Sequence, residues 1–510
     1  MATEQVQLGY SPKNIPISNK WNYRQSLVTK TKSFLRAVTW KATFFLKKAT
    51  PNNKETFGFK SSLDPKRLPE LKEFENKILD LIQNIEFKDT NHHVNDFQSK
   101  LRNNMKQVKE NPKVFVKGDK TNNYHTMTKE IYQQHINSNV QKCYKKCPPT
   151  DINKLIKEEK KIASKLGLAD RMDIPGKTDA YVTLKDTKPN FRNNPTFRLI
   201  NTNKSELGKV AKQTLQNINQ IVRNQLNCNQ WRNTQDVLKW FNNLQNKNNL
   251  HFIQFDISEF YPSITEKLLK EALEWAEGYT YISDEDKEII LTATNSTLYL
   301  NGKPWKKKTC ENFFDLTMGC FHGAEGCELV GLFLLFQLKE INFNGGLYRD
   351  DGLGVLNGTK RQNENVKKKI CEIFSRNSLK ITVEVNMKTV DFLDVTLNLQ
   401  RDLFSPYMKP NNILQYVNVS SNHPPNIIKN IPESVNKRLN SLSKNENIFY
   451  QSIPPYQEAL DRCGYQYNLN FVPHQPPQQI RRRRRNIIWY NPPYCKSVKT
   501  NIGKEFFSRF

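Results

Sequence analysis

The sequence predicts an α+β fold divided among several subdomains. Residues 251–399 alternate short apolar segments with longer amphipathic ones, the pattern of strands mixed with helices. The chain has 510 residues, enough for roughly two to four domains. Although its mean hydropathy is −0.72, 37% of its residues are hydrophobic and 11% are aromatic, so the chain is very polar but able to build a core.

Charge and cysteine content indicate the partner and the compartment. The formal net charge is +28 and the pI is about 9.6, which points to a polyanionic partner, with nucleic acid as the first candidate. No apolar run approaches the ~20 residues that cross a bilayer, and the N-terminus lacks a secretory signal. The nine cysteines form no paired framework. We therefore expect an intracellular protein, nuclear or cytoplasmic, with no membrane partner.

The N-terminal half predicts the following elements in order. The first fifty residues read as a basic arm or loosely packed extension, and residues 63–109 show apolar side chains at helical spacing. Residues 114–132 predict a strand, a polar turn and a second strand entering a helix. An amphipathic helix is expected at 155–168, and residues 180–222 predict two strands and a long helix. Cys143 and Cys147 have the spacing of one helix face, but no second Cys or His pair stands near them, so no structural zinc is expected.

Two acidic segments stand out in the central region. HFIQFDISEFYPSI, residues 251–264, is an apolar strand with Asp256 near its end, followed by a turn into a helix. GLYRDDGLGV, residues 346–355, reads as a hairpin whose tight turn carries Asp350 and Asp351 at an exposed tip. An aspartate pair alone is most often a polar surface turn. Asp256 and Asp350 are 94 residues apart, which suits two strands of one sheet with helices between them.

Phosphoryl transfer supplies a reason to group these carboxylates. In-line transfer needs both the attacking and the leaving oxygen stabilised, which two Mg²⁺ ions ~3.5–4 Å apart achieve. Mg²⁺ keeps water and phosphate ligands, so a few aspartates on a rigid sheet are enough. Three aspartates of this kind make a minimal polymerase palm.

The two acidic segments resemble motifs A and C of reverse transcriptases, and the chain as a whole resembles reverse transcriptases of the Penelope-like retroelement type. FDISEFYPSI is similar to motif A, and LYRDD is similar to the Tyr-x-Asp-Asp box of motif C. Similarity to the upstream segment, the two finger motifs, motif B, the D and E region and the thumb is carried, in this order, by KGDKTNNYHTMTKEIY, YVTLKDTKPNF, FRLINTNKSELGK, DLTMGCFHGAEGCELVG, ITVEVNMKTVDFLDVTLNL and SSNHPPNIIKNIPESVNKRL. The resemblance covers roughly residues 114–507 and is specific because the motifs occur together in order.

The resemblance implies a right-hand polymerase of fingers, palm and thumb with a helical N-terminal extension. The expected divisions are a basic, partly helical extension at 1–110, fingers at 111–250, a palm with motifs A to E at 251–400, a thumb at 401–475 and a basic C-terminal segment at 476–510. The implied activity is RNA-directed DNA synthesis with Mg²⁺, or Mn²⁺ as a substitute. Its partners would be an RNA template, a DNA primer and dNTPs. The oligomeric state is not predicted.

The resemblance also implies roles for single residues. Asp256, Asp350 and Asp351 would be catalytic, and the metal site would comprise these three with Ile257. Tyr261 matches the aromatic gate that excludes a ribose 2′-hydroxyl, and its alternative is an ordinary core aromatic. The remaining implied residues are Lys185, Arg198 and Gly319 for nucleotide binding, and Phe392, Leu393 and Asp394 of FLDV for the primer grip.

Some features leave alternatives open. Motif B departs from the family's usual Gly-Ser-Pro pattern, and either Lys380 or Lys388 could be the general acid. His423 reads as a metal ligand or, more simply, as a structural residue of the thumb. The five arginines at 481–485 could be a nuclear localisation signal, a phosphate contact or a solvated run.

The family often carries a GIY-YIG endonuclease after the thumb, and no such motif occurs in this sequence. One rival function is a decayed or domesticated nucleic-acid-binding derivative, which the altered motif B favours and the intact aspartates disfavour. The other is an RNA-dependent RNA polymerase, which Tyr261 and the Tyr-Arg opening of motif C disfavour.

Overall fold

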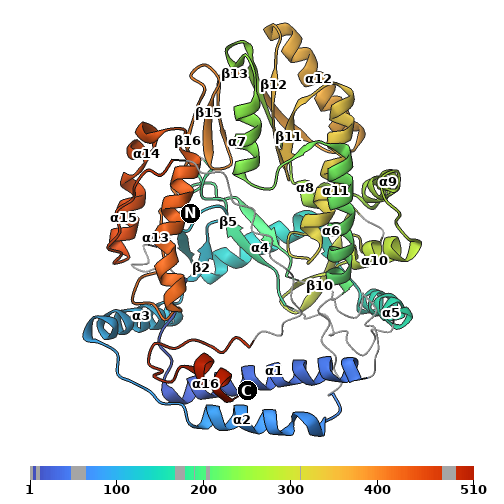
Figure 1. Ribbon diagram of the computed structural model, residues 1–510. Helices are drawn as coiled ribbons and strands as arrows, with labels where there is room; N and C mark the ends of the chain where they lie inside the picture. The colour runs from blue at the N-terminus through green and yellow to red at the C-terminus, as the bar shows by residue number, and fades with distance from the viewer. Residues whose placement is uncertain are drawn as a thin grey trace.

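The computed structural model describes residues 4–6, 12–46, 65–166, 178–188, 190–202, 207–309, 312–473 and 490–509. It confirms the predicted fold class: helices and sheets mix in an α+β chain with the arrangement of a right-hand polymerase, a central sheet flanked by two lobes (Figure 1). None of the helices in these ranges is long and apolar enough to cross a membrane.

The central sheet has the strand order β13-β8-β12-β11-β7. The interior strand β8 (His251–Ile257) pairs antiparallel with β12 (Asp351–Leu356) on one side and with β13 (Ile381–Met387) on the other. β11 (Asn344–Tyr348) forms a hairpin with β12, and the short β7 (Asn229–Gln230) runs parallel to β11. The predicted pairing of two acidic segments within one sheet is therefore confirmed.

Helices cover one face of this sheet and build the largest core. α11 (Gly323–Glu340) is the most buried of them and packs between α6 (Leu207–Leu226), α9 (Glu266–Glu277) and α12 (Lys360–Arg376), while α10 (Asp284–Thr294) packs against α6. The apolar residues of α11 surround the helix because protein covers almost its whole surface. A one-turn helix, α8 (Phe260–Ser263), follows β8 directly.

The opposite face of the sheet is covered by a second, smaller core. α7 (Thr234–Asn243) packs there with a three-stranded antiparallel sheet of β14 (Thr389–Phe392), β15 (Val395–Asn398) and β16 (Leu403–Pro406). The Trp231 ring meets the Phe392 ring edge to face at 5.6 Å, joining the two layers. Lys247–Asn249 forms a short 3-10 turn before β8.

The fingers lobe is built mostly from residues before β8, with two strands added from between α10 and α11. It contains a sheet of order β1-β3-β2, a hairpin β5-β6 and a sheet of order β4-β10-β9 around one apolar core. Its elements are β1 (Glu4–Val6), β2 (Val114–Lys117), β3 (Tyr124–Met127), α4 (Lys129–Cys143), β4 (Tyr144–Lys146), α5 (Pro149–Lys165), β5 (Tyr181–Leu184), β6 (Phe197–Ile200), β9 (Leu298–Leu300) and β10 (Lys303–Lys307). The strand, turn, strand and helix predicted for 114–132 are confirmed.

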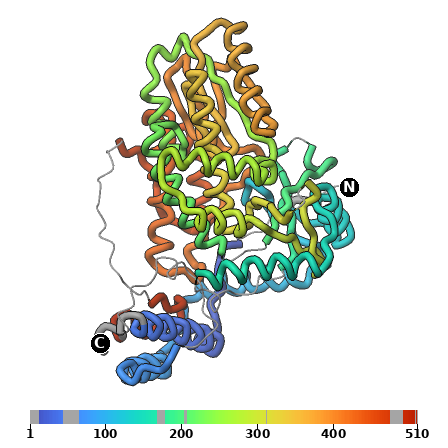
Figure 2. Tube along the Cα trace, turned by 90° about the vertical axis from the view of Figure 1, so that its right-hand side faces the viewer, coloured from blue at the N-terminus to red at the C-terminus, as the bar shows by residue number. Residues whose placement is uncertain are grey.

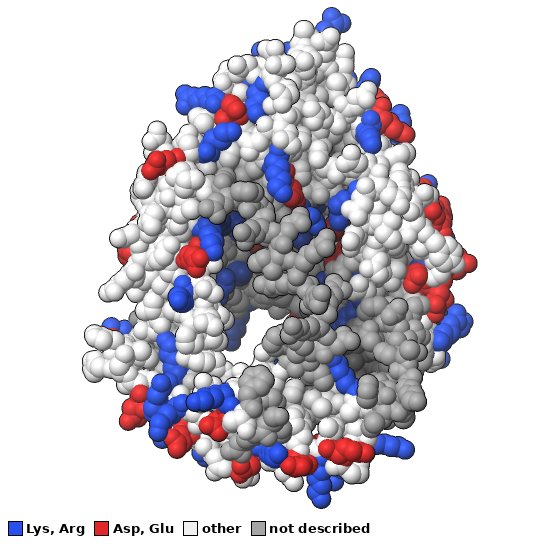
Figure 3. Space-filling model, viewed as in Figure 1, with Lys and Arg blue, Asp and Glu red and all other residues white. Residues whose placement is uncertain are grey.

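The thumb is a helical lobe after β16. It consists of α13 (Pro425–Leu442), α14 (Glu446–Ser452) and α15 (Pro454–Arg462), which share a core of their own. Figure 3 shows a hollow beside this lobe, with Lys and Arg side chains along the side that the thumb forms.

The N-terminal extension folds with the C-terminal segment. α1 (Lys20–Leu46), α2 (Lys72–Gln83) and α16 (Ile502–Arg509) form a layer beneath the other lobes, and α3 (His92–Glu110) connects it to the thumb (Figures 1 and 2). Pro69–Leu71 forms a 3-10 turn directly before α2.

The structure corrects two sequence expectations about local packing. A loosely packed arm was expected for the first fifty residues, but α1 buries Tyr23 and Leu27 against α2 and the C-terminal segment. Cys143 and Cys147 do not share a helix face, because Cys143 ends α4 and β4 separates it from Cys147.

The cores also cross the expected divisions between lobes. α6 and α7, expected in the fingers, pack in the two cores that flank the central sheet. β9 and β10, expected in the palm, complete the fingers sheet through β4. The arginines at 481–485 lie outside the described residues.

Candidate active site

Strand pairing brings the predicted carboxylates together. Asp351, the first residue of β12, pairs with Asp256 near the end of β8, and Asp350 directly precedes β12. The Ile257 amide donates a hydrogen bond of 2.9 Å to the Asp350 carbonyl, which ties the hairpin to the end of β8. Three carboxylates are therefore carried by adjacent central strands, at the edge where both strands meet the cavity.

The hairpin turn differs from the one expected. Because Tyr348 pairs with Asp351, the two-residue turn is Arg349–Asp350, and only Asp350 of the pair lies at its tip. Arg349 adopts φ 55°, a left-handed conformation that costs a non-glycine residue about 1–2 kcal/mol. Its guanidinium lies 5.8 Å from the centre of the Tyr348 ring.

The glycines around the aspartates serve packing rather than the turn. A Cβ on Gly352 would lie 2.2 Å from the Phe255 ring, and one on Gly346 would lie 2.2 Å from the Asn229 carbonyl oxygen. The missing side chains thus let an aromatic ring cover β12 and let β7 approach β11.

Asp256, Asp350 and Asp351 interact electrostatically with one another. Burial, and then the charge of Asp350, raises the pKa of Asp351 to about 6. The pKa of Asp256 is also raised, first by burial and then by Asp350. Lys120 opposes both shifts, joined by Lys409 at Asp351. Clustered like charges of this kind are stabilised by a bound cation.

The donor set fits Mg²⁺ in its chemistry. Carboxylate oxygens are hard ligands, and their excess negative charge is what a divalent ion offsets. Among the described residues, no three His, Cys, Asp or Glu side chains already close around a metal position. Mg²⁺ does not need such a cage, because it retains water and takes substrate phosphates as ligands.

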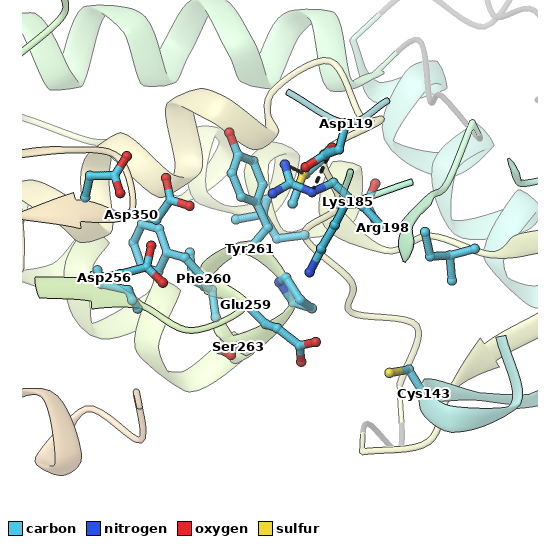
Figure 4. Close-up of a pocket in the computed structure, with 18 of the residues that line it drawn as sticks. Asp119, Cys143, Lys185, Arg198, Asp256, Glu259, Phe260, Tyr261, Ser263 and Asp350 are labelled. Atoms are coloured by element: carbon cyan, nitrogen blue, oxygen red, sulfur yellow. Dashed lines mark hydrogen bonds and ion pairs between the residues drawn. The ribbon is translucent and has the colours of Figure 1, made fainter. Parts of the chain in front are cut away.

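The carboxylates open into a cavity of about 1420 Å³ between palm and fingers. Figure 4 shows Asp256 and Asp350 beside each other on one wall, with Tyr261 between them and the finger residues Lys185 and Arg198. Tyr261 is 8% exposed, and burial raises the pKa of its hydroxyl. It lies on α8, so the turn after β8 aims its ring into the cavity.

The finger residues come from the β5–β6 hairpin. Arg198 Nε lies 3.2 Å from Asp119 Oδ1, and that carboxylate also accepts a bond of 3.2 Å from the Thr183 hydroxyl. Burial, and then the charge of Arg198, lowers the pKa of Lys185. Two cations from one hairpin thus face the carboxylates across the cavity.

Gly319 makes a backbone contact within the protein. A Cβ at this position would lie 1.5 Å from the Asn201 carbonyl oxygen, so no side chain fits. The residue before it, Met318, lines the cavity and is 41% exposed. The nucleotide-binding role of Gly319 stays a prediction, and the observed contact joins motif B to the end of β6.

The predicted primer-grip residues form the β14–β15 turn. Phe392 is buried, whereas Leu393 and Asp394 are the two turn residues, with Leu393 at φ 55°. Asp394 accepts a bond of 3.2 Å from the Thr234 hydroxyl and pairs with Arg438 of the thumb. Phe392 and Leu393 line the cavity.

The lysines considered as general acids lie differently. Lys388 Nζ donates to the Asn248 and Leu250 carbonyls at 2.8 and 2.6 Å, at the end of β8 away from Asp256. The Lys380 carbonyl accepts from the Ser258 amide at 2.8 Å, beside the carboxylates. His423 Nδ1 lies 2.9 Å from the Ser421 hydroxyl in the loop before α13.

Sequence reasoning missed many residues of the cavity wall, and three of them bear on the carboxylates: Asp119, Lys120 and Lys409. Asp119 and Lys120 belong to KGDK, a segment recognised for its resemblance but given no chemical role. Lys409 has no local signal, because only the fold brings it to Asp351.

No protein-family model and no curated protein matches the sequence. Solved structures do match. The chain is similar to telomerase from Candida albicans in complex with a TWJ fragment of telomeric RNA, at 10% identity and TM-score 0.47 over 80% of this chain and 70% of that one. Apo telomerase from Candida tropicalis matches at 12% identity and TM-score 0.43, over 78% and 75% of the two chains. The RNA-dependent RNA polymerase of a human picobirnavirus matches at 12% identity and TM-score 0.38, over 90% and 92%. At these values, the function proposed below rests on the geometry of the site itself.

Proposed function

We propose that this protein is an RNA-directed DNA polymerase, a reverse transcriptase of the Penelope-like retroelement type. The observation that carries the proposal is the pairing of Asp351 with Asp256, with Asp350 beside them, at a cavity whose far wall holds Lys185 and Arg198. Carboxylates facing two cations across a large cavity suit a substrate that carries both a divalent metal and phosphates.

The chain's residues divide the work of phosphoryl transfer. Asp256 and Asp350 would hold Mg²⁺, or Mn²⁺ in its place, with Asp351 and the Ile257 backbone supporting the site. When bound, the metal ions stabilise charge on the attacking and leaving oxygens. Lys185 and Arg198 would bind the triphosphate, where the guanidinium fork matches phosphate oxygens.

Tyr261 would select the sugar. Its buried ring lies between the carboxylates and the finger cations, where the ribose of a bound nucleotide would be held. A 2′-hydroxyl would overlap the ring, so deoxynucleotides would be favoured.

The remaining partners follow from the charge. A net charge of +28 suits a primer and template bound through their phosphates, with affinity that falls as salt rises. We expect recognition of hybrid shape and backbone rather than of sequence. The protein would act in the nucleus or the cytoplasm.

The experiment compares Tyr261→Val with Tyr261→Phe, which keeps the ring. Primer extension on poly(rA)/oligo(dT) with Mg²⁺ gives kcat/KM for dTTP and UTP. Steric overlap of about 1–3 kcal/mol predicts that Tyr261→Val lowers the dTTP preference by roughly 5- to 150-fold. Tyr261→Phe should keep the wild-type preference.

Each other outcome has a distinct meaning. An unchanged ratio in Tyr261→Val would remove Tyr261 from sugar selection. A wild type that prefers UTP would favour an RNA polymerase. Hybrid binding without any extension would favour the nucleic-acid-binding derivative.

A further inference from the structure

Two lysines from distant parts of the chain meet at the catalytic carboxylates. Lys120 lies in the loop between β2 and β3, and Lys409 follows β16; both line the cavity with Asp256 and Asp351. Each acts electrostatically on Asp351, and they also act on each other. Within the described part of the chain, neither is within salt-bridge distance of a carboxylate. Their charges are therefore available to a ligand.

A buried carboxylate fixes the loop that carries Lys120. Asp186 Oδ2 accepts hydrogen bonds from the Thr121 hydroxyl at 2.5 Å and the Asn123 amide at 3.1 Å, and His125 Nε2 lies 3.2 Å away. A Cβ on Gly118 would lie 2.2 Å from the Thr121 hydroxyl oxygen, so the loop closes tightly on Asp186. A loop fixed in this way holds the backbone of Lys120 in one position.

The loop also joins the strands that carry the triphosphate residues. The Asp119 amide donates to the Leu184 carbonyl at 2.7 Å, and the Asp119 carboxylate pairs with Arg198. The backbone of Lys120 is thus fixed relative to Arg198, and the Lys120 charge acts on Asp256 and Asp351.

The same loop holds the segment that carries Lys409. Asn123 Nδ2 donates to the Asn411 carbonyl at 2.6 Å, and the Asn122 amide donates to Asn412 Oδ1 at 3.3 Å. At its other end, this segment is tied to the β14–β15 turn, because the Tyr407 amide donates to the Asp394 carbonyl at 2.8 Å. One network of hydrogen bonds therefore sets the positions of both lysines.

We propose that Lys120 and Lys409 form a phosphate-binding site for the primer strand, next to its reactive 3′-end. Two ammonium groups held close to each other repel, and an anion between them removes that cost. Burial, and then the charge of Lys120, lowers the pKa of Lys409, and a bound anion would offset this shift. Because the β14–β15 turn carries the predicted primer grip, the hydrogen bond that ties the Lys409 segment to this turn favours the primer strand as the source of the phosphate.

The test rests on the proposed function and uses primers with one uncharged methylphosphonate linkage, placed at the first, second or third position from the 3′-end. The variants are Lys120→Gln, Lys409→Gln and the double variant. The control is Lys117→Gln with Lys129→Gln, which removes the same charge from exposed positions that do not line the cavity.

We expect one methylphosphonate position to slow wild-type extension by about 10- to 100-fold, the worth of a charged hydrogen bond. The double variant should be slowed by a similar factor with the natural primer and should show no added loss with that modified primer. KM for dNTP should change little. The control should behave as wild type.

The alternatives give different results. A raised KM for dNTP and slowed pyrophosphorolysis, with the methylphosphonate effect intact, would assign the lysines to the triphosphate and overturn the proposal. Equal losses of extension rate in the double variant and in the control would show that the lysines contribute only general positive charge, and would overturn the proposal.

If the wild type binds primer and template but does not extend, the proposed polymerase function fails while the site remains testable. Equilibrium binding of the same primer series then replaces the rate. Loss of the methylphosphonate effect in the double variant would support the site, and its persistence would refute it.

Discussion

Two hairpins of the palm have the same kind of turn, but the aspartate in each turn has different partners. In β11–β12 and in β14–β15, the first turn residue is a non-glycine at φ 55°, Arg349 or Leu393, and the second is an aspartate, Asp350 or Asp394. Asp394 pairs with Arg438 and accepts from Thr234. Asp350 has no cation at salt-bridge distance among the described residues.

The difference shows that backbone geometry does not by itself define the site. In the β14–β15 turn, Asp394 is neutralised by Arg438 at the place where the thumb packs. In the β11–β12 turn, Asp350 has no such partner among the described residues and lies beside Asp256 and Asp351. Strained turns persist at positions where the surrounding structure fixes them, and both hairpins line the cavity. The surroundings of the carboxylate therefore distinguish the proposed metal ligand from a docking contact.

The largest expected difference is in catalysis. Asp350→Asn should lower kcat for primer extension by on the order of 10³-fold, because a metal ligand worth several kcal/mol loses its charge. Asp394→Asn should lower it less than about tenfold, since its ion pair with the half-exposed Arg438 is worth about 1 kcal/mol or less. Single-turnover extension measures both, and filter binding should show nearly unchanged affinity for primer and template. Equal losses in the two variants would end the distinction between the hairpins.

The next difference is in stability without metal. The pKa of Asp351 is about 6 in the folded state, above its usual 3.8, so its protonated form favours folding. That contribution is complete below pH 3.8 and is lost as pH rises through about 6. At pH 8 in EDTA, Asp351→Asn should therefore unfold at a higher denaturant concentration than wild type. Its free energy of unfolding should be higher by at most about 3 kcal/mol.

Magnesium sharpens the same measurement. At pH 8, Mg²⁺ should raise the stability of wild type and Asp394→Asn alike, and that of Asp351→Asn less. The gain from Asp351→Asn should shrink at low pH. A wild type indifferent to both Mg²⁺ and Asp351→Asn would show that the carboxylates are not electrostatically strained.

The smallest difference concerns the turn residues. Arg349→Gly should stabilise the protein by about 1 kcal/mol, because glycine adopts positive φ without the Cβ clash. Leu393→Gly should instead be neutral or destabilising by about 1 kcal/mol, since Leu393 packs against the core around Trp231. Urea unfolding at pH 7 compares them, and a gain of equal size in both variants would mean that the Leu393 side chain contributes no packing.

The strands that carry the three aspartates of the candidate site could be predicted from the sequence. The apolar run ending at Asp256 has to be a buried strand, and the hairpin with Asp350 and Asp351 has the alternation to lie beside it. The exact turn was missed, because flanking glycines usually mark the turn itself. Here Gly352 makes room for Phe255, a contact between strands almost a hundred residues apart.

Residues brought in by loops could not be predicted. The segment of Lys409 is held at the site by hydrogen bonds such as those from Asn123 to Asn411 and from Asn122 to Asn412, and side-chain amides carry no periodic signal. The contact of Gly319 with the Asn201 carbonyl is likewise a meeting of two backbones that no local pattern encodes.

The position of β8 has a consequence for synthesis of the chain. β8 emerges from the ribosome before both strands that cover its edges, β12 and β13, which end only at Met387. At ~5–20 residues per second, the 130 residues from Ile257 to Met387 take roughly 6–26 s. During that time an apolar strand has two open edges, the condition under which chains pair with each other. Yield in cells should therefore depend on chaperones and on translation speed through this interval more than on the final stability of the palm.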